Sequence, residues 1–177
     1  MEVNKILIAG FGGQGILFSG KSLAFTGLKA QKEVSWLPSY GPEMRGGTAS
    51  CSVIVSDTPV GSPIVEKPNI LIAMNKPSLE KYINDTEEGG YIIYDSSLID
   101  SNATKEGVTT FGIPATKMAS DNGLNGLANI IIIGKVIKET KLFTLEQIKN
   151  SLSQMVPKNR QELLEKNIKA IELGYNY

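Results

Sequence analysis

A short glycine-rich segment near the N-terminus constrains the fold of this chain most strongly. Residues 6–9 form a β-branched apolar run typical of a buried strand, the glycine-rich segment follows at once, and a helical apolar pattern comes next. Strand, glycine turn and helix in this order begin a doubly wound α/β sheet. The turn leaves backbone N–H groups accessible at the positive end of the helix dipole, which predicts an anion site. The candidate cofactor-binding residues are Gly10, Gly12, Gly13, Gln14 and Gly15.

Other interpretations of the same turn are open. Gly-x-Gly-x-x-Gly by itself is a weak signal, so the turn can also serve only to pack the helix on the strand, with nothing bound. Residues 15–22 satisfy the phosphate-loop pattern Gly-x4-Gly-Lys-Ser, and Asp95 follows an apolar run that could supply a magnesium ligand. This pattern begins well beyond the strand, its interior is bulky, and Lys21 would lie in the second turn of the helix, which disfavours a phosphate loop.

A dinucleotide site is disfavoured for a different reason. The acidic residue that binds ribose is expected at the end of the second strand, roughly 20 residues after the glycines. Glu33 instead precedes the apolar residues 34–37, so it begins that strand. NAD is therefore a weaker candidate ligand, although a stand-alone nucleotide-binding protein is kept as an alternative.

The composition excludes several kinds of site. The chain has one cysteine, Cys51, and no histidine. One thiol cannot form an internal disulfide or ligate an iron–sulfur cluster, and the absence of histidine removes the commonest general base and metal ligand. Cys51 lies in a β-branched run, which predicts a small buried strand residue, the alternative being a reactive thiol.

Charge and hydropathy indicate an intracellular protein. The formal net charge is zero, so no basic field attracts nucleic acid or acidic lipid. The N-terminal apolar run is short and is broken by Gly10, so it predicts neither a signal peptide nor a membrane span. We therefore expect a cytoplasmic location, with no nucleic acid and no membrane as partner.

The remaining pattern predicts one α/β domain over residues 1–177, with a core over 1–140 and C-terminal helices over 141–177. Further strands are predicted at 34–37, 49–56, 70–74, 91–94 and 108–111. Helices are predicted after Pro77 and Pro114, in the ambiguous apolar run 129–134, from a capping box at Thr144, and around Ile168. The expected fold is doubly wound, Rossmann-like and mainly parallel, with helices on both faces.

Residues 38–47 interrupt all periodicity with two prolines and three glycines. This composition predicts a loop, and its large polar and aromatic residues favour a functional loop over a long turn with a solvated ion pair. Asn75 ends a predicted strand at the edge where parallel sheets place ligands. The candidate substrate or interface residues are Ser39, Tyr40, Gly41, Glu43, Arg45, Gly46, Gly47 and Asn75. Arg45 is the candidate to hold a carboxylate or phosphate at two points, or else a partner subunit.

With these motifs, the chain resembles the gamma subunit of the 2-oxoacid:ferredoxin oxidoreductases, most closely the 2-oxoglutarate type. The resemblance covers at least residues 6–78. It rests on the glycine turn, on Trp-Leu-Pro-Ser-Tyr-Gly-Pro-Glu-Met-Arg-Gly-Gly at 36–47, on Gly-Ser-Pro-Ile-Val at 61–65 and on Ala-Met-Asn-Lys-Pro-Ser at 73–78. The segment 36–47 is long and chemically unusual, so it is the most specific of these motifs.

The resemblance implies a non-autonomous subunit that is inactive alone and has neither catalytic residues nor metal ligands. The complex would convert a 2-oxoacid and coenzyme A into acyl-CoA and carbon dioxide and pass electrons to ferredoxin. Alpha and beta partners would carry thiamine diphosphate and magnesium, with iron–sulfur clusters on beta or on a ferredoxin-like delta subunit. The gamma domain would cover the active-site region, with coenzyme A among its candidate ligands. A purely structural interaction module is the third class of function.

Overall fold

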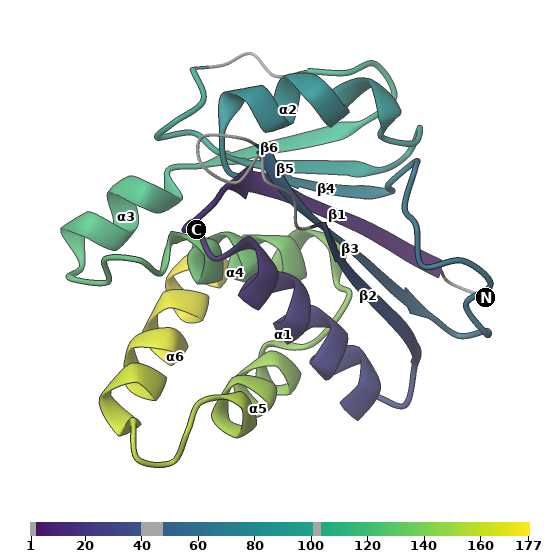
Figure 1. Cartoon of the computed structure of the whole chain (residues 1–177). Coiled ribbons are helices and arrows are strands. Elements are labelled where there is room, and N and C mark those ends of the chain that lie inside the picture. The colour runs from purple at the N-terminus through teal and green to yellow at the C-terminus, as the bar shows by residue number, and fades with distance from the viewer. Residues whose placement is uncertain (1–2, 40–47, 101–103) are drawn as a thin grey trace.

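The computed structural model describes residues 3–39, 48–100 and 104–177 (Figure 1). Its strands are β1 (Val3–Phe11), β2 (Glu33–Ser39), β3 (Thr48–Ser56), β4 (Ile70–Ala73), β5 (Tyr91–Asp95) and β6 (Thr109–Ile113). Its helices are α1 (Ile16–Lys29), α2 (Lys76–Tyr82), α3 (Ala115–Asp121), α4 (Ala128–Thr140), α5 (Leu145–Met155) and α6 (Gln161–Asn176), with a short 3-10 helix η2 (Ile83–Asp85). The predicted strands and helices are all present, and only their ends differ.

The six strands form one sheet in the order β2-β3-β1-β4-β5-β6. Strands β1, β4, β5 and β6 run parallel, whereas β3 is antiparallel to both of its neighbours, β1 and β2. The expected α/β fold with a mainly parallel sheet is therefore confirmed, in the form of a mixed sheet. The position of β3 between β1 and β2 was not predicted, because an apolar pattern identifies a strand without identifying its neighbour.

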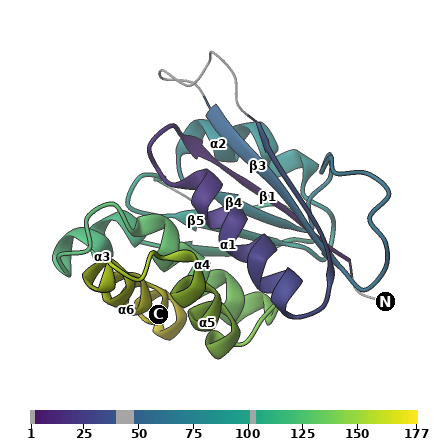
Figure 2. The ribbon, with the colours of Figure 1, turned by 60° about the horizontal axis from the view of Figure 1, so that its bottom comes forward.

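Helices cover both faces of the sheet, as predicted (Figures 1 and 2). Side chains alternate along β1, so Ile6 and Ile8 enter a large core with α1 and α4, while Leu7 enters a smaller core with Leu79 of α2. The ambiguous run at residues 129–134 is the buried helix α4, in which the four isoleucines at 130–133 are all buried. A helix that is apolar all round must be covered all round. Here the sheet covers one side of α4 and α6 packs closely on another.

The contact between α4 and α6 brings the two backbones together. A Cβ atom added at Gly174 would lie 1.7 Å from the carbonyl oxygen of Ile131, and one added at Gly134 would lie 2.2 Å from that of Ile171. No side chain fits between the helices at these points. The C-terminal helix is therefore fixed against the core by contact between backbones.

Cys51 lies in β3 and is fully buried, so the predicted strand position is confirmed. Burial raises the pKa of its thiol to about 11, while a hydrogen bond from Trp36 opposes the shift. Because the thiolate is the nucleophile, complete burial and the raised pKa both disfavour a reactive cysteine at neutral pH.

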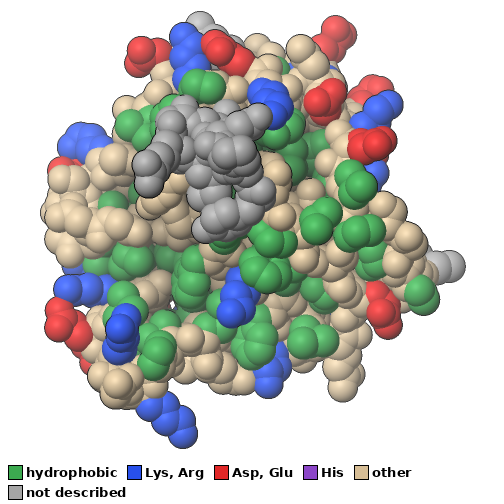
Figure 3. Space-filling model, viewed as in Figure 1, with side chains coloured by type: hydrophobic (Ala, Val, Ile, Leu, Met, Phe, Trp, Pro, Cys, Tyr) green, Lys and Arg blue, Asp and Glu red, His purple; other side chains and the backbone are tan. Residues whose placement is uncertain are grey.

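The surface seen in Figure 3 carries cationic and anionic side chains interspersed, with apolar groups between them. This mixture agrees with the formal net charge of zero. None of the helices in the described part of the chain combines the length and the apolar character that a bilayer span needs.

Candidate functional site

The glycine turn leaves the carboxyl end of β1 and leads into α1, as the sequence predicts. Gly15 is the N-cap of α1 with φ 75° and ψ 20°, a left-handed conformation that favours glycine. A Cβ atom at Gly15 would also lie 2.4 Å from Nδ2 of Asn129. No side chain caps the N-terminus of α1. The turn therefore places a helix N-terminus, with its positive dipole end, at the edge of the sheet.

Gln14 ties the turn to the end of β4. Its Oε1 accepts from the backbone N–H of Phe11 at 2.6 Å, and its Nε2 donates to the carbonyl oxygen of Met74 at 3.0 Å. Asn75, the N-cap of α2, donates from Nδ2 to Gln14 Oε1 at 3.4 Å and accepts from the Ser78 N–H at 2.8 Å. Two predicted site residues, Gln14 and Asn75, are thus brought together. Their hydrogen bonds hold the backbone of the glycine turn against the backbone that follows β4.

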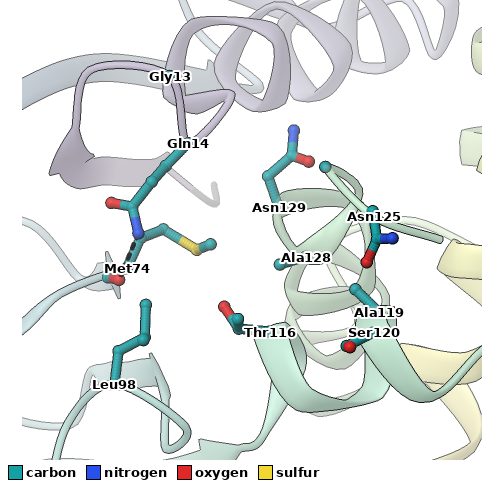
Figure 4. Close-up of a pocket in the computed structure, with 11 residues that line it drawn as sticks. Gly13, Gln14, Met74, Leu98, Thr116, Ala119, Ser120, Asn125, Ala128 and Asn129 are labelled. Carbon is teal, nitrogen blue, oxygen red and sulfur yellow. Dashed lines mark hydrogen bonds between the residues drawn. The ribbon is translucent and has the colours of Figure 1, made fainter. Parts of the chain in front are cut away.

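A cavity of about 430 Å³ opens beside the turn (Figure 4). Residues from the turn, the end of β4, the loop after β5, α3 and the start of α4 line it. They are Gly13, Gln14, Met74, Leu98, Thr116, Ala119, Ser120, Asn125, Gly126, Ala128 and Asn129. Every polar side chain in this lining is neutral. An anion here would depend on backbone N–H groups and helix dipoles, whereas an uncharged polar group has hydroxyl and amide partners.

The surroundings of Asp95 decide whether it is available as the magnesium ligand of a phosphate loop. Its carboxylate is fully buried, and one oxygen accepts from the Ser97 N–H at 2.9 Å. The other oxygen accepts from the N–H and the hydroxyl of Thr116, at 3.0 and 2.5 Å. Asp95 therefore caps a turn and holds Thr116 at the cavity wall. Since Lys21 is exposed on α1 and Asp95 is engaged in these bonds, the phosphate-loop interpretation fails.

The other predicted residues divide into two groups. Gly10 lies buried in β1 and Gly12 lies exposed in the turn. Ser39 is exposed and ends β2, where a dinucleotide site would have an acid. The predicted residues outside the described part of the chain are Tyr40, Gly41, Glu43, Arg45, Gly46 and Gly47.

Sequence reasoning missed the far wall of the cavity. Thr116, Ser120, Asn125 and Asn129 come from α3, α4 and the loop between them, far along the chain from the turn. A usable signal was the doubled Asn-Gly-Leu at residues 122–127, whose asparagines and glycines are typical of a structured turn. This segment carries Asn125 and ends just before α4.

Comparisons with known proteins identify the family. The model of the pyruvate ferredoxin/flavodoxin oxidoreductase family matches residues 5–177. The chain belongs to this family. The resemblance drawn from residues 6–78 is thereby confirmed, and it extends over nearly the whole sequence.

Relatives within the family differ in length. The 2-oxoglutarate synthase subunit KorC of Methanocaldococcus jannaschii is 36% identical over 97% of this chain and 91% of its own length. The ketoisovalerate oxidoreductase subunit VorA of Methanothermobacter marburgensis is 35% identical over 98% of this chain, but over only 36% of its own length. The chain thus spans about a third of the VorA relatives that it matches.

A solved structure agrees with the fold. The gamma subunit of the keto/oxoacid ferredoxin oxidoreductase of Geobacter sulfurreducens superposes with a TM-score of 0.83 at 27% identity. The match covers 98% of this chain and 96% of that chain.

Proposed function

We propose that this chain is the gamma-type subunit of a 2-oxoacid:ferredoxin oxidoreductase, with 2-oxoglutarate as the first candidate substrate. The observation that carries the proposal is its match to nearly the whole of KorC but to only a third of VorA. The same unit forms a separate chain in one relative and part of a longer chain in the other. A unit that is found both as a separate chain and as part of a longer chain is typical of a domain that functions in contact with the other domains of a complex.

The proposed complex decarboxylates its 2-oxoacid oxidatively to acyl-CoA and passes electrons to ferredoxin. Thiamine diphosphate and magnesium belong to the alpha and beta partners, and iron–sulfur clusters to beta or a delta subunit. The residues of this chain do not fit such a cluster, since one cysteine cannot supply four thiolates. No redox step is therefore assigned to this chain.

The cavity beside the glycine turn suits coenzyme A, whereas the chain lacks the cysteines that an iron–sulfur cluster needs. Its arm between thiol and phosphates is uncharged and carries amides, and the cavity offers neutral partners such as Thr116, Asn125 and Asn129. The role proposed for these residues is to bind and orient that arm. Because Asp95 holds Thr116 by two hydrogen bonds, this wall is preorganised for the task.

The test is purification of the tagged full-length chain from its native host. We expect alpha and beta chains to copurify in constant ratio, with thiamine diphosphate and iron, and the isolate to reduce ferredoxin with a 2-oxoacid only when coenzyme A is present. The chain freed from its partners should be colourless and inactive. Recovery of the chain alone, or turnover of any 2-oxoacid by it alone, contradicts the proposal. Comparing 2-oxoglutarate, 2-oxoisovalerate and pyruvate then identifies the substrate.

Arg45 remains the proposed anion contact of the segment 38–47. In the assembled complex, Arg45→Lys should raise an apparent Michaelis constant roughly ten- to a hundredfold, because a two-point charged contact contributes about 1.5–3 kcal/mol. Subunit composition should stay the same. Unchanged kinetics would remove Arg45 from the ligand site, and loss of this chain from the complex would make it an interface residue.

A further inference from the structure

One hydroxyl group of the cavity beside the glycine turn has its hydrogen-bond direction fixed by the fold. It belongs to Thr116, in the first turn of α3, and its oxygen is directed into the cavity (Figure 4). Asp95 pairs with Ile113 in the ladder between β5 and β6, so Thr116, three residues after Ile113, comes beside the end of β5. The hydroxyl and the N–H of Thr116 both contact Oδ2 of Asp95, at 2.5 and 3.0 Å.

The direction of the short bond follows from the chemistry of its two partners. An ionised carboxylate has no proton and only accepts, so the Thr116 hydroxyl is the donor. A distance of 2.5 Å is typical of a hydroxyl that donates to a carboxylate. The other oxygen of Asp95 accepts from the Ser97 N–H at 2.9 Å, and the carboxylate is fully buried. The orientation of the carboxylate is therefore set on both of its oxygens.

The one proton of the Thr116 hydroxyl is thus committed to Asp95. Two lone pairs remain on the hydroxyl oxygen, and no described residue donates to them. Threonine is β-branched and its N–H is bonded to the same carboxylate, so the side chain has little freedom to turn its proton elsewhere. Toward the cavity, Thr116 is therefore an acceptor and not a donor.

Other polar groups of the same wall have no fixed direction. Ser120 and Asn125 are exposed, and their side chains make no hydrogen bond within the described part of the chain. Each can turn to donate or to accept, so neither selects one ligand group over another. Thr116 does select, because a second acceptor placed against its oxygen would leave both atoms without a proton between them.

We propose that Thr116 is a specificity-determining residue of this cavity, which selects a ligand with an N–H donor at this point, and that Asp95 is the positioning residue that sets its polarity. The inference rests on the proposed function for the identity of the ligand. The donor is then an amide N–H of the uncharged arm of coenzyme A, and a carbonyl or ester oxygen in the same place is rejected. Thr116 thus fixes which edge of that amide faces the wall.

The test uses the purified complex and compares coenzyme A with analogues in which an amide N–H of the arm is replaced by an ester oxygen, one analogue for each amide. For one analogue, the apparent Michaelis constant should be roughly tenfold or more above that of coenzyme A, because an oxygen then faces the Thr116 acceptor. Equal constants for coenzyme A and every analogue overturn the proposal.

Two variants assign this discrimination to the hydroxyl. Thr116→Val removes it at similar volume, and should raise the constant for coenzyme A about tenfold while the discriminated analogue stays within about twofold of its wild-type value. Both kcat and the constant for the 2-oxoacid should stay unchanged, which separates this effect from a general loss of structure. Thr116→Ser retains the hydroxyl and should keep the wild-type pattern. The matched control is Thr109→Val, at an exposed position of β6 outside the cavity. Equal changes for coenzyme A and its analogues in Thr116→Val would mean that the hydroxyl does not contact the amide.

Asp95→Asn tests the positioning role. With its oxygen held by the Ser97 N–H, the new amide group donates to the Thr116 hydroxyl, whose own proton is then available to the cavity. The preference for coenzyme A over the discriminated analogue should therefore disappear, and an unchanged preference removes Asp95 from this role. The two Thr116 variants keep the carboxylate, so they decide the role of the hydroxyl even where Asp95→Asn does not assemble.

Failure of the proposed function is recognised in the wild type, before any variant is compared. A chain recovered without partners, or a complex that turns over without coenzyme A, contradicts the proposed function. In that case the full chain is titrated calorimetrically with pantetheine and its ester analogues. A weaker affinity for one analogue, lost in Thr116→Val, would still support the role of Thr116. Equal affinities, or no binding at millimolar concentration, would overturn it.

Discussion

The glycine turn and the contact between α4 and α6 both depend on the absence of a side chain, but what occupies the freed space differs. At Gly174 the backbone of α4 lies where a Cβ atom would be. At Gly15 the neighbour is the amide of Asn129, and at Gly13 nothing lies within 4 Å of a Cβ position. Gly174 and Gly15 each mark a close approach, whereas Gly13 borders open space. Only the surroundings distinguish a packing contact from a turn that a ligand can reach.

The largest effect should come from Gly174→Ala. Its Cβ would lie 1.7 Å from a backbone oxygen that cannot turn aside, so α6 must shift from α4. We expect a loss of about 3 kcal/mol or more in the free energy of unfolding, measured by urea denaturation. The control is Gly61→Ala, where a Cβ meets nothing within 4 Å and the loss of chain entropy on folding is reduced. Equal unfolding midpoints for the two variants would mean that the helices are not in contact.

The next largest effect should come from Gly15→Ala, compared with Gly13→Ala. Both residues have positive φ, which costs an L residue about 1–2 kcal/mol. Only Gly15→Ala also pushes against the Asn129 amide, so it should destabilise the chain by about 1 kcal/mol more than Gly13→Ala does. Thermal unfolding of both variants measures the difference. Identical losses would show that the Asn129 side chain moves aside at no cost. The space beside Gly15 would then not be restricted in the way that the backbone of α4 restricts the space beside Gly174.

Gln14→Leu tests whether the turn is held from β4. The variant loses the bonds to Phe11 and Met74, so we expect a loss of about 1–2 kcal/mol and faster hydrogen exchange at the Phe11 amide. Lys21→Ala, an exposed change on α1, is the control and should stay within about 0.5 kcal/mol. Unchanged exchange at Phe11 in Gln14→Leu would show that the turn keeps its shape without this side chain.

The smallest effect concerns the pH dependence of stability that the Cys51 thiol causes. This thiol lies at a third close approach, between α1 and β3, where a Cβ at Gly20 would lie 2.4 Å from Sγ of Cys51. Burial raises the pKa of this thiol from 9.0 to about 11, so the folded chain keeps the proton to higher pH than the unfolded chain does. The resulting stability is fully present below pH 9 and is lost as the pH rises through 11. By pH 10 the loss should be about 1 kcal/mol.

The check on this prediction is urea unfolding between pH 8 and 10, with Cys51→Ala as control. The control has no thiol and should lack this part of the pH dependence. Parallel curves for the two proteins would contradict the pKa assigned to Cys51.

Much of the local structure could be predicted from the sequence, because its causes lie within a few residues. The capping box at Thr144 forms as predicted, with bonds of 3.2 and 2.8 Å between Thr144 and Gln147. The glycine turn leaves its strand as expected, and Glu33 begins β2. The family could also be recognised, because the segment 36–47 is chemically unusual as a linear string.

Tertiary structure alone decided which elements are neighbours. Strand β3 is antiparallel between β1 and β2, a choice that depends on packing over the whole sheet and not on its own β-branched residues. The same holds for the cavity beside the glycine turn. Asn129 reaches Gly15 only because the buried helix α4 lies under the sheet. Contacts between residues so far apart depend on the shape of the assembled core, which no local pattern encodes.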